Sequence, residues 1–317
     1  MDNLLEAWQE FIQGKRSRAD VQEFGRDLMS NLFALHQRLE DGTYIHAPYS
    51  AFTISDPKTR SIHKASVADR VLHRAIYRKL YPSFDRTFIA DSFSCRMGKG
   101  THKALDRFER MAGQASKNHR RTVWVLKCDV RKFFASIDQR VLLAMLDARL
   151  ADKRFVRLFG IILGSFSAGE TGIGLPLGNL TSQLLANVYL DAFDQFMKHK
   201  LRVKYYVRYA DDFVILSDER QYLECLLPMI ADFLWRELRL RLHPGKVELR
   251  TVASGVDFLG WTHFPDHRVL RTVTKRRMLN ALNGGATKPV VASYRGLLTH
   301  GNAHGLARFL NGGRTPS

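Results

Sequence analysis

Two β-prone apolar runs that meet at a pair of adjacent aspartates constrain this chain more than any other feature. Residues 205–216 read Tyr-Tyr-Val-Arg-Tyr-Ala-Asp-Asp-Phe-Val-Ile-Leu, with carboxylates at Asp211 and Asp212. The pattern predicts a tight hairpin with strands at 203–209 and 213–216, separated by the acidic pair. An ordinary turn is one explanation, since Asp favours turns. Two-residue hairpin turns usually carry Asn-Gly or Asp-Gly, however, and adjacent carboxylates resist desolvation. A divalent cation would remove that cost, which favours a metal site.

A third aspartate ends another apolar segment. Residues 123–128 predict a buried strand, and Asp129 follows directly. Carboxylates at strand ends can converge in one sheet although they are distant in sequence. Asp129 with Asp211 and Asp212 would then offer the hard oxygen ligands that Mg²⁺ prefers. Two such ions can support phosphoryl transfer. Taken alone, Asp129 is as often a strand-end or cap residue as a ligand.

The remaining hydrophobic pattern predicts a mixed α+β chain. Short extended pieces are predicted between residues 44 and 62. Helical spacing predicts helices in residues 1–45, 68–80, the stretch after Asp129 to about 150, 179–200 and 221–239. Pro82 lies just beyond the segment 68–80. Together these elements predict an α+β sheet with helices on one face, in one large domain or two modest ones.

Charge indicates a polyanionic partner. The 317 residues include 49 Lys plus Arg and 31 Asp plus Glu, a net charge of +18. Nucleic acid is the first expectation and an anionic membrane surface the competitor. Residues 266–317 carry nine Lys or Arg and one acid, Asp266, which favours an element that grips a polynucleotide.

The apolar segments are too short for a membrane protein. The longest, 158–166, is well below the roughly 18–20 residues that span a bilayer. The N-terminus shows no secretory signal, and three widely spaced cysteines indicate neither a disulfide framework nor a zinc site. We therefore expect a cytoplasmic setting without membrane contact.

An ordered set of motifs resembles the reverse transcriptases of bacterial retroelements. Residues 209–212, Tyr-Ala-Asp-Asp, resemble their YxDD box, and 129–134 resemble their first catalytic box. Further blocks that are similar, in the expected order, are 60–62, 68–73, 91–100, 242–246 and 258–260. The resemblance implies an RNA-directed DNA polymerase with an α+β right-hand fold, whose palm is an antiparallel sheet backed by helices. Fingers and palm would occupy residues 1–265 and a short basic helical thumb 266–317.

Two segments narrow the resemblance. The block 173–183 ends in Ser-Gln where most reverse transcriptases have Ser-Pro, and Leu177 stands where many carry Gln. These features, with residues 293–296 and 299–303, are similar to the enzymes of diversity-generating retroelements. That resemblance implies a bacterial or phage enzyme that copies a template-repeat RNA into error-prone cDNA. Its partners would be template RNA, primer or cDNA, dNTPs and a small basic, oligomeric accessory protein. A phage-defence or retron enzyme is the nearer alternative, and a non-catalytic RNA-binding protein the other.

The resemblance also assigns roles to individual residues. Two Mg²⁺ ions would be held by the side chains of Asp129, Asp211 and Asp212 and the Val130 carbonyl. Nucleotide contacts are expected from Lys58, Arg60, Phe134 (as a sugar gate), Leu177, Gly178 and Lys246. A primer grip would comprise Phe258, Leu259 and Gly260. Nucleic-acid contacts are expected from Arg70, Arg96, Lys275, Arg276 and Arg277.

Most of these residues also have a purely structural explanation. Phe133 and Phe134 can fill a sheet–helix interface, and Lys58 and Arg60, on the candidate fingers strands, can belong to a solvated basic strand. Lys246 can form a salt bridge, the 258–260 segment can be a hydrophobic strand, and Gly178 can open a helix. Leu177 offers only apolar contact, and selectivity based on shape is weaker than selectivity based on hydrogen bonds, so relaxed fidelity is predicted.

Overall fold

The computed structural model describes residues 1–55 and 59–310 and combines helices with antiparallel sheets. It confirms the predicted α+β class. Its internal contacts define two compact units. The first comprises Met1–Ala90, Val130–Leu201 and Ala231–Leu242, and the second comprises Asp91–Asp129, Arg202–Ile230 and His243–Ser317.

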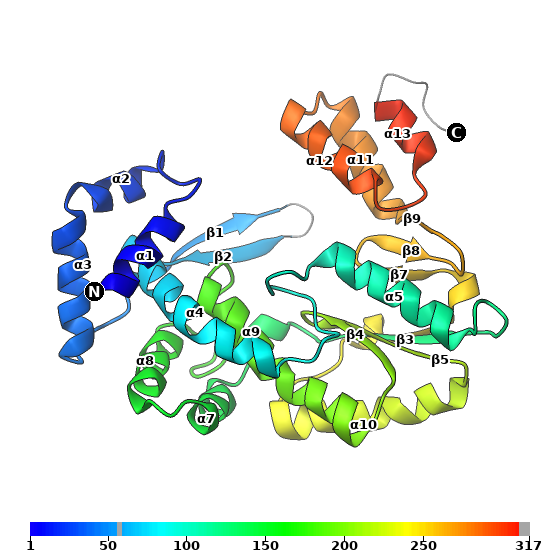
Figure 1. Ribbon diagram of the computed structural model, residues 1–317, viewed down its shortest axis with the longest axis horizontal. Coiled ribbons are helices and arrows are strands. Elements are labelled where there is room, and N and C mark those ends of the chain that lie inside the picture. The colour runs from blue at the N-terminus through cyan, green and yellow to red at the C-terminus, as the bar shows by residue number, and fades with distance from the viewer. Residues whose placement is uncertain (56–58, 311–317) are drawn as a thin grey trace. The chain divides into compact units, whose positions relative to one another are not determined.

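Helices make up most of the first unit (Figure 1). They are α1 (Asp2–Phe11), α2 (Ala19–Arg26), α3 (Leu28–Glu40), α4 (Val67–Thr87), α6 (Phe133–Ser136), α7 (Gln139–Arg149), α8 (Lys153–Gly164), α9 (Leu180–Gln195) and the π-helical turn η1 (Phe196–Lys200). Helix α4 packs against both α1 and α9. On α1, Leu4, Trp8 and Phe11 are buried on one face, as helical spacing predicts. Strands β1 (Ser50–Ile54) and β2 (Arg60–Lys64) form an antiparallel hairpin.

Helix α4 is longer than the sequence pattern predicted. We expected it to end at residue 80 with Pro82 beyond its end, but Pro82 lies inside the helix. A proline in a helix interior removes one hydrogen bond and costs about 3 kcal/mol. Tyr81 and Phe84 on either side of it are buried, and Phe88 just after the helix is buried as well. Burial of these three aromatic side chains offsets the cost, so the helix continues.

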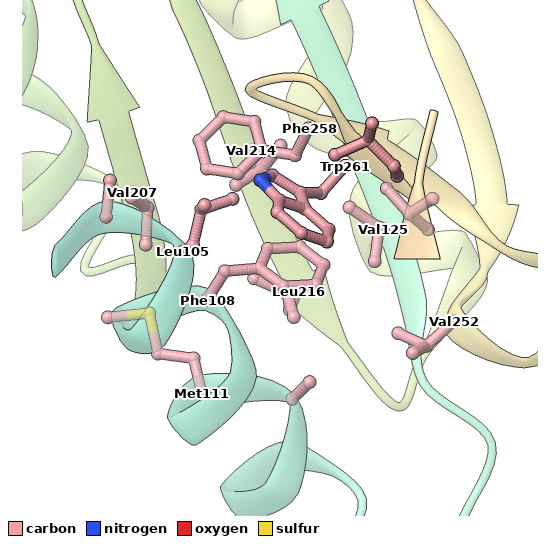
Figure 2. Close-up of a cluster of buried hydrophobic side chains, with 14 of the residues drawn as sticks. Leu105, Phe108, Met111, Val125, Val207, Val214, Leu216, Val252, Phe258 and Trp261 are labelled. Atoms are coloured by element: carbon pink, nitrogen blue, oxygen red, sulfur yellow. The ribbon is translucent and has the colours of Figure 1, made fainter. Parts of the chain in front are cut away.

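A four-stranded antiparallel sheet forms the centre of the second unit. Its order is β4 (Tyr205–Tyr209), β5 (Asp212–Ser217), β3 (Trp124–Asp129) and β6 (Glu248–Thr251). Helix α5 (Thr101–Ala115) covers one face, and Figure 2 shows Leu105 and Phe108 of this helix among Val125, Val214 and Leu216 of the strands. The antiparallel sheet backed by a helix is therefore confirmed.

A smaller sheet and three helices follow in the second unit. Strands β7 (Val256–Phe258), β8 (Trp261–His263) and β9 (Arg268–Leu270) are antiparallel. Helices α11 (Thr272–Asn283), α12 (Lys288–Leu298) and α13 (His304–Leu310) complete the described chain (Figure 1). The other elements are α10 (Arg220–Leu238), whose residues divide between the two units, and the 3₁₀ turns η2 (Pro244–Lys246) and η3 (Val252–Ser254). Within residues 1–55 and 59–310, no helix is both long enough and apolar enough to cross a bilayer.

Candidate active site

The β4–β5 hairpin presents the acidic pair, with a turn one residue earlier than predicted. Tyr209 and Asp212 are paired in the ladder, so the turn consists of Ala210 and Asp211. Asp212 is not a turn residue but the first residue of β5. Ala210 has a φ of +53°, a left-handed conformation that costs a non-glycine residue about 1–2 kcal/mol. This conformation closes the hairpin in two residues and leaves Asp212 in the strand.

A buried arginine that the sequence analysis did not single out supports this turn. Arg208 is 1% exposed, and its guanidinium donates to the Ala210 carbonyl and to Ser92 Oγ, both at 3.0 Å. Its backbone bonds to Asp91 and Phe93, so residues 91–93, at the start of the 91–100 block, lie beside β4. The signal in the sequence was a charged residue inside an apolar strand, because a buried charge requires hydrogen-bonded partners.

The ladder places Asp129 directly opposite Asp212. Asp129 is the last residue of β3 and Asp212 the first of β5, so they form the terminal pair of this ladder, at the end of the sheet where the hairpin turns. Lys246 Nζ lies 2.8 Å from Asp129 Oδ2, so Lys246 forms the salt bridge that was one of its two explanations. The His243 N–H donates to the Asp129 carbonyl. Val130, the next residue, is buried and forms an isolated bridge with Leu242.

Burial and neighbouring charges act together on the Asp212 carboxyl. Burial is the main cause that raises the pKa of its carboxyl to about 7, and the charges of Asp129 and Asp211 add to it, while Lys127 and Lys246 oppose it. Its Oδ1 atom is buried without a hydrogen-bond partner. A bound cation would provide that partner and would favour the ionised form.

The donor atoms therefore suit Mg²⁺, which prefers carboxylate oxygens. Within the described part of the chain, however, no group of three His, Cys, Asp or Glu side chains is arranged to hold a metal ion. Two features suit a bound cation: the buried Asp212 oxygen, which has no hydrogen-bond partner, and the carboxylate of Asp129 in the opposite strand. The three acids are close in the fold without forming a complete coordination shell.

The loop before α9 is held against strand β2. The His63 N–H donates to the Leu177 carbonyl at 2.9 Å, and Asn179 Nδ2 donates to the His63 carbonyl at 3.0 Å. Gly178 between them has a φ of +105°, and a Cβ there would lie 2.8 Å from Ile62 Cγ2. Glycine is needed at this position for both its backbone conformation and the close approach of β2.

The other residues predicted to contact nucleotide differ in their surroundings. Phe133 is buried and Phe134 half-buried, so Phe133 fills the core position of this pair. Arg60 is exposed on β2. Lys58 lies outside the described residues.

The predicted primer-grip segment is a hairpin turn. Phe258 and Trp261 are paired across β7 and β8, and Leu259 and Gly260 between them both have positive φ, +48° and +88°. This is the backbone pattern of a type I′ turn. Phe258 is buried in the hydrophobic cluster of the second unit, and Leu259 packs against that cluster.

The predicted nucleic-acid-binding cations are also placed by the structure. Arg70 is half-buried, lies 2.5 Å from Asp20 Oδ2, and covers the Phe11 ring at 5.0 Å, so it takes part in helix packing. Arg96 donates to the Ser92 carbonyl at 3.0 Å. Helix α11 carries Lys275, Arg276 and Arg277, of which Arg276 is exposed.

The architecture is the right-hand polymerase fold, as predicted. Telomerase from Candida albicans, solved in complex with a TWJ fragment of telomeric RNA, matches with a TM-score of 0.54 at 11% identity, over 81% of this chain and 55% of that chain. Truncated apo telomerase from Candida tropicalis matches with a TM-score of 0.53 at 9% identity, over 77% and 60%. Likeness at such low identity concerns the fold alone.

The family follows from the sequence comparisons. The family described as reverse transcriptase (RNA-dependent DNA polymerase) matches residues 55–263. Protein YkfC of Escherichia coli K12 is 25% identical over 300 residues, covering 80% of this chain and 78% of YkfC. Group II intron-encoded protein LtrA of Lactococcus lactis is 22% identical over 311 residues, and the match covers 76% of this chain and half of LtrA. The chain belongs to the reverse transcriptase family, a family of nucleotidyltransferases that act as RNA-directed DNA polymerases.

Proposed function

We propose that this protein binds a template RNA and extends a primer on it with dNTPs. One observation carries the proposal. Asp129 and Asp212 face each other across β3 and β5, beside the turn that contains Asp211, and Asp212 keeps a buried oxygen without a partner. In a chain of this family, such a pair is suited to phosphoryl transfer.

The proposed reaction is an in-line displacement. The 3′-hydroxyl of the primer releases its proton to water as its oxygen forms a bond to the α-phosphorus of a dNTP. The bond from that phosphorus to the bridging oxygen breaks, and pyrophosphate leaves. Asp129, Asp211, Asp212 and the Val130 carbonyl would hold two Mg²⁺ ions, which neutralise phosphate charge when bound.

Other residues keep these acids in place. Lys246 orients the Asp129 carboxylate through its 2.8 Å ion pair, and Arg208 holds the turn through the Ala210 carbonyl. Lys246 would also supply a proton to the leaving pyrophosphate. These contacts are made by the protein itself before substrate binds, which reduces the reorganisation that the reaction requires.

The remaining roles are proposed from the family motifs. Nucleotide contacts are assigned to Lys58, Arg60, Phe134, Leu177 and Gly178, the primer grip to residues 258–260, and nucleic-acid contacts to Arg70, Arg96 and the cations of α11. Residues 266–317 would act as the thumb, after fingers and palm in residues 1–265. Cations outnumber acids nine to one in that segment, and the exposed ones, such as Arg276, suit a polynucleotide backbone.

A role in a diversity-generating retroelement is the finer proposal. Its support is the Ser-Gln ending at residues 182–183, Leu177, and the segments 293–296 and 299–303. The template would then be a template-repeat RNA, the partner a small basic accessory protein, and the setting the bacterial cytoplasm. A neighbouring template repeat and accessory gene would support this role, whereas a neighbouring toxin or effector gene would favour phage defence or a retron.

The test of polymerase activity is primer extension on an RNA template with Mg²⁺ and dNTPs. Asp212→Asn keeps the shape of the side chain but removes its charge, and we expect it to reduce extension at least about a hundredfold. The matched control is Asp218→Asn, in the same unit but just beyond the opposite end of β5, where the acid pairs with Arg121 on the surface. This control should extend like the parent, and both variants should bind RNA.

Two results would contradict the proposal. A parent protein that binds RNA but extends no primer would identify a non-catalytic RNA-binding protein. Equal activity of the Asp212→Asn variant and the parent would remove the acidic site from the mechanism.

A further inference from the structure

Arg268 of β9 joins three parts of the second unit. Its side chain is 9% exposed. Nη2 donates to Asp106 Oδ1 at 3.0 Å, and Nη1 lies 3.1 Å from Glu109 Oε1 as an ion pair, both acids being on α5. Nε donates to the carbonyl of His300, in the loop between α12 and α13. The guanidinium thus contacts both α5, the helix that covers the sheet, and the loop that connects α12 to α13.

The loop at residues 299–303 is held from further directions. The Asn302 N–H donates to the Arg268 carbonyl at 2.8 Å. The His300 ring stacks on His102 of α5, with centroids 3.4 Å apart. A Cβ at Gly301 would lie 2.1 Å from Cζ3 of Trp261, and the φ of Gly301 is outside the left-handed range. Glycine is therefore required by the close approach of the tryptophan rather than by backbone conformation.

The residues that hold this loop lie next to the predicted primer-grip turn and next to the hairpin that carries the acidic pair. Trp261 is the residue that follows the Leu259–Gly260 turn. The first turn of α5, which carries His102, also carries Thr101, whose hydroxyl donates to the Tyr209 hydroxyl at 3.1 Å. Tyr209 is the last residue of β4 before the acidic turn. One helix therefore contacts both the catalytic hairpin and the C-terminal loop.

Helices α11, α12 and α13 contribute few fully buried apolar side chains. Among the described side chains of residues 272–310, the buried hydrophobic ones are Met278, Leu298, Ala303 and Leu306. Others, such as Leu279, Leu282 and Leu297, are only partly buried against the hydrophobic cluster, and a segment with few fully buried side chains opens at a low free-energy cost. Charge-assisted hydrogen bonds are directional and strong, so the Arg268 contacts are suited to give this segment a defined position.

We propose that Arg268 is a positioning residue that locks the loop at residues 299–303 onto α5 and β8. The lock keeps helices α12 and α13 in register with the Leu259–Gly260 turn, so that the primer–template duplex stays bound between successive additions of nucleotide. It acts on retention of the duplex and not on the bond-forming step. This inference rests on the polymerase function proposed above.

The test uses the full chain and two substitutions that disturb the lock differently. Gly301→Ala places a methyl group against Trp261 without altering any charge. Its matched control is Gly296→Ala on α12, where a Cβ would meet nothing within 4 Å. Arg268→Lys keeps the charge but cannot make the forked contacts with Asp106 and Glu109. Primer extension on an RNA template is measured with a trap that captures released enzyme, together with the rate of nucleotide addition at saturating duplex and dNTP.

We expect Gly301→Ala and Arg268→Lys to raise the rate of duplex dissociation about tenfold, the size expected for loss of one hydrogen bond to a charged group. Products made in one binding event should shorten accordingly. The rate of addition at saturation should stay within about twofold of the parent, and Gly296→Ala should match the parent throughout. Melting temperatures report whether each variant is folded.

Three results would overturn the inference. One is product length unchanged in both variants, and another is a lower rate of addition with unchanged dissociation. The third is an equal loss of retention in Gly296→Ala. If Gly301→Ala fails to fold, Arg268→Lys decides by the same criteria, and if that variant also fails, Asp106→Asn decides. A parent that extends no primer refutes the polymerase proposal itself and is recognised before any variant is compared.

Discussion

Acidification is expected to destabilise the first unit through His73 on helix α4. This side chain is 1% exposed, neither of its ring nitrogens has a hydrogen-bond partner, and it stacks on His46 with centroids 5.3 Å apart. Burial, reinforced by His46, lowers the pKa of His73 to about 3, while Asp69 opposes the shift. The folded protein therefore keeps this ring neutral at pH values where an exposed histidine is charged.

The sign and size of the effect follow from proton linkage. As pH falls below about 6.5, the unfolded chain binds a proton at this position before the folded chain does, so the free energy of unfolding decreases. The loss continues until the pH reaches the folded pKa. Each pH unit in this window is worth about 1.4 kcal/mol, so the loss between about pH 7 and about pH 5 is about 2 kcal/mol.

The measurement is urea unfolding followed by circular dichroism at both pH values, on the parent and His73→Leu. Leucine cannot bind a proton, so the variant should lose about 2 kcal/mol less than the parent on acidification. His199→Leu is the control, because His199 is exposed in the π-helical turn, and it should follow the parent. The reasoning is refuted if parent and His73→Leu lose the same stability between the two pH values.

Two predictions concern the loop that precedes α9. Leu177→Gln should change the error spectrum on an RNA template, because an amide can make hydrogen bonds that leucine cannot; sequenced cDNA with an unchanged spectrum would exclude this residue. Gly178→Ala should destabilise the protein by about 1–2 kcal/mol through its positive φ and should raise the KM for dNTP by displacing the loop from Ile62. Thermal unfolding and extension kinetics measure both effects, with Gly160→Ala in α8 as the control, because the added methyl there would lie more than 4 Å from every part of the chain beyond its own helix turn. Identical behaviour of the two alanine variants would contradict the argument.

Local patterns were sufficient for the elements that carry the acids. The two β-prone apolar runs that meet at the acidic pair in 205–216, and the apolar run at 123–128, predicted β3, β4 and β5, and the structure contains all three. Hydrophobic pattern and residue type predict such strands because both depend only on residues that are near neighbours in the sequence. The family motifs extended this to the fold, and the comparisons confirm the reverse transcriptase family.

Local patterns failed where distant contacts decide the outcome. Pro82 lies inside α4 because buried aromatic side chains offset its cost. The acidic turn begins at Ala210 because Arg208 and the ladder hold a left-handed residue there. From its local sequence alone, Pro82 predicts the end of a helix, and the pair Asp211 and Asp212 predicts a turn at those two residues.

By itself, the sequence determined the existence of the sheet strands, the acidic pair and the basic C-terminal segment. Only the tertiary structure decided that Asp129 pairs with Asp212, that Lys246 neutralises Asp129, and that Arg268 joins α5 to the loop at residues 299–303. The reason is physical. Strand register and partly buried ion pairs join residues more than 80 positions apart in the chain, and their energies depend on burial that only the assembled fold creates.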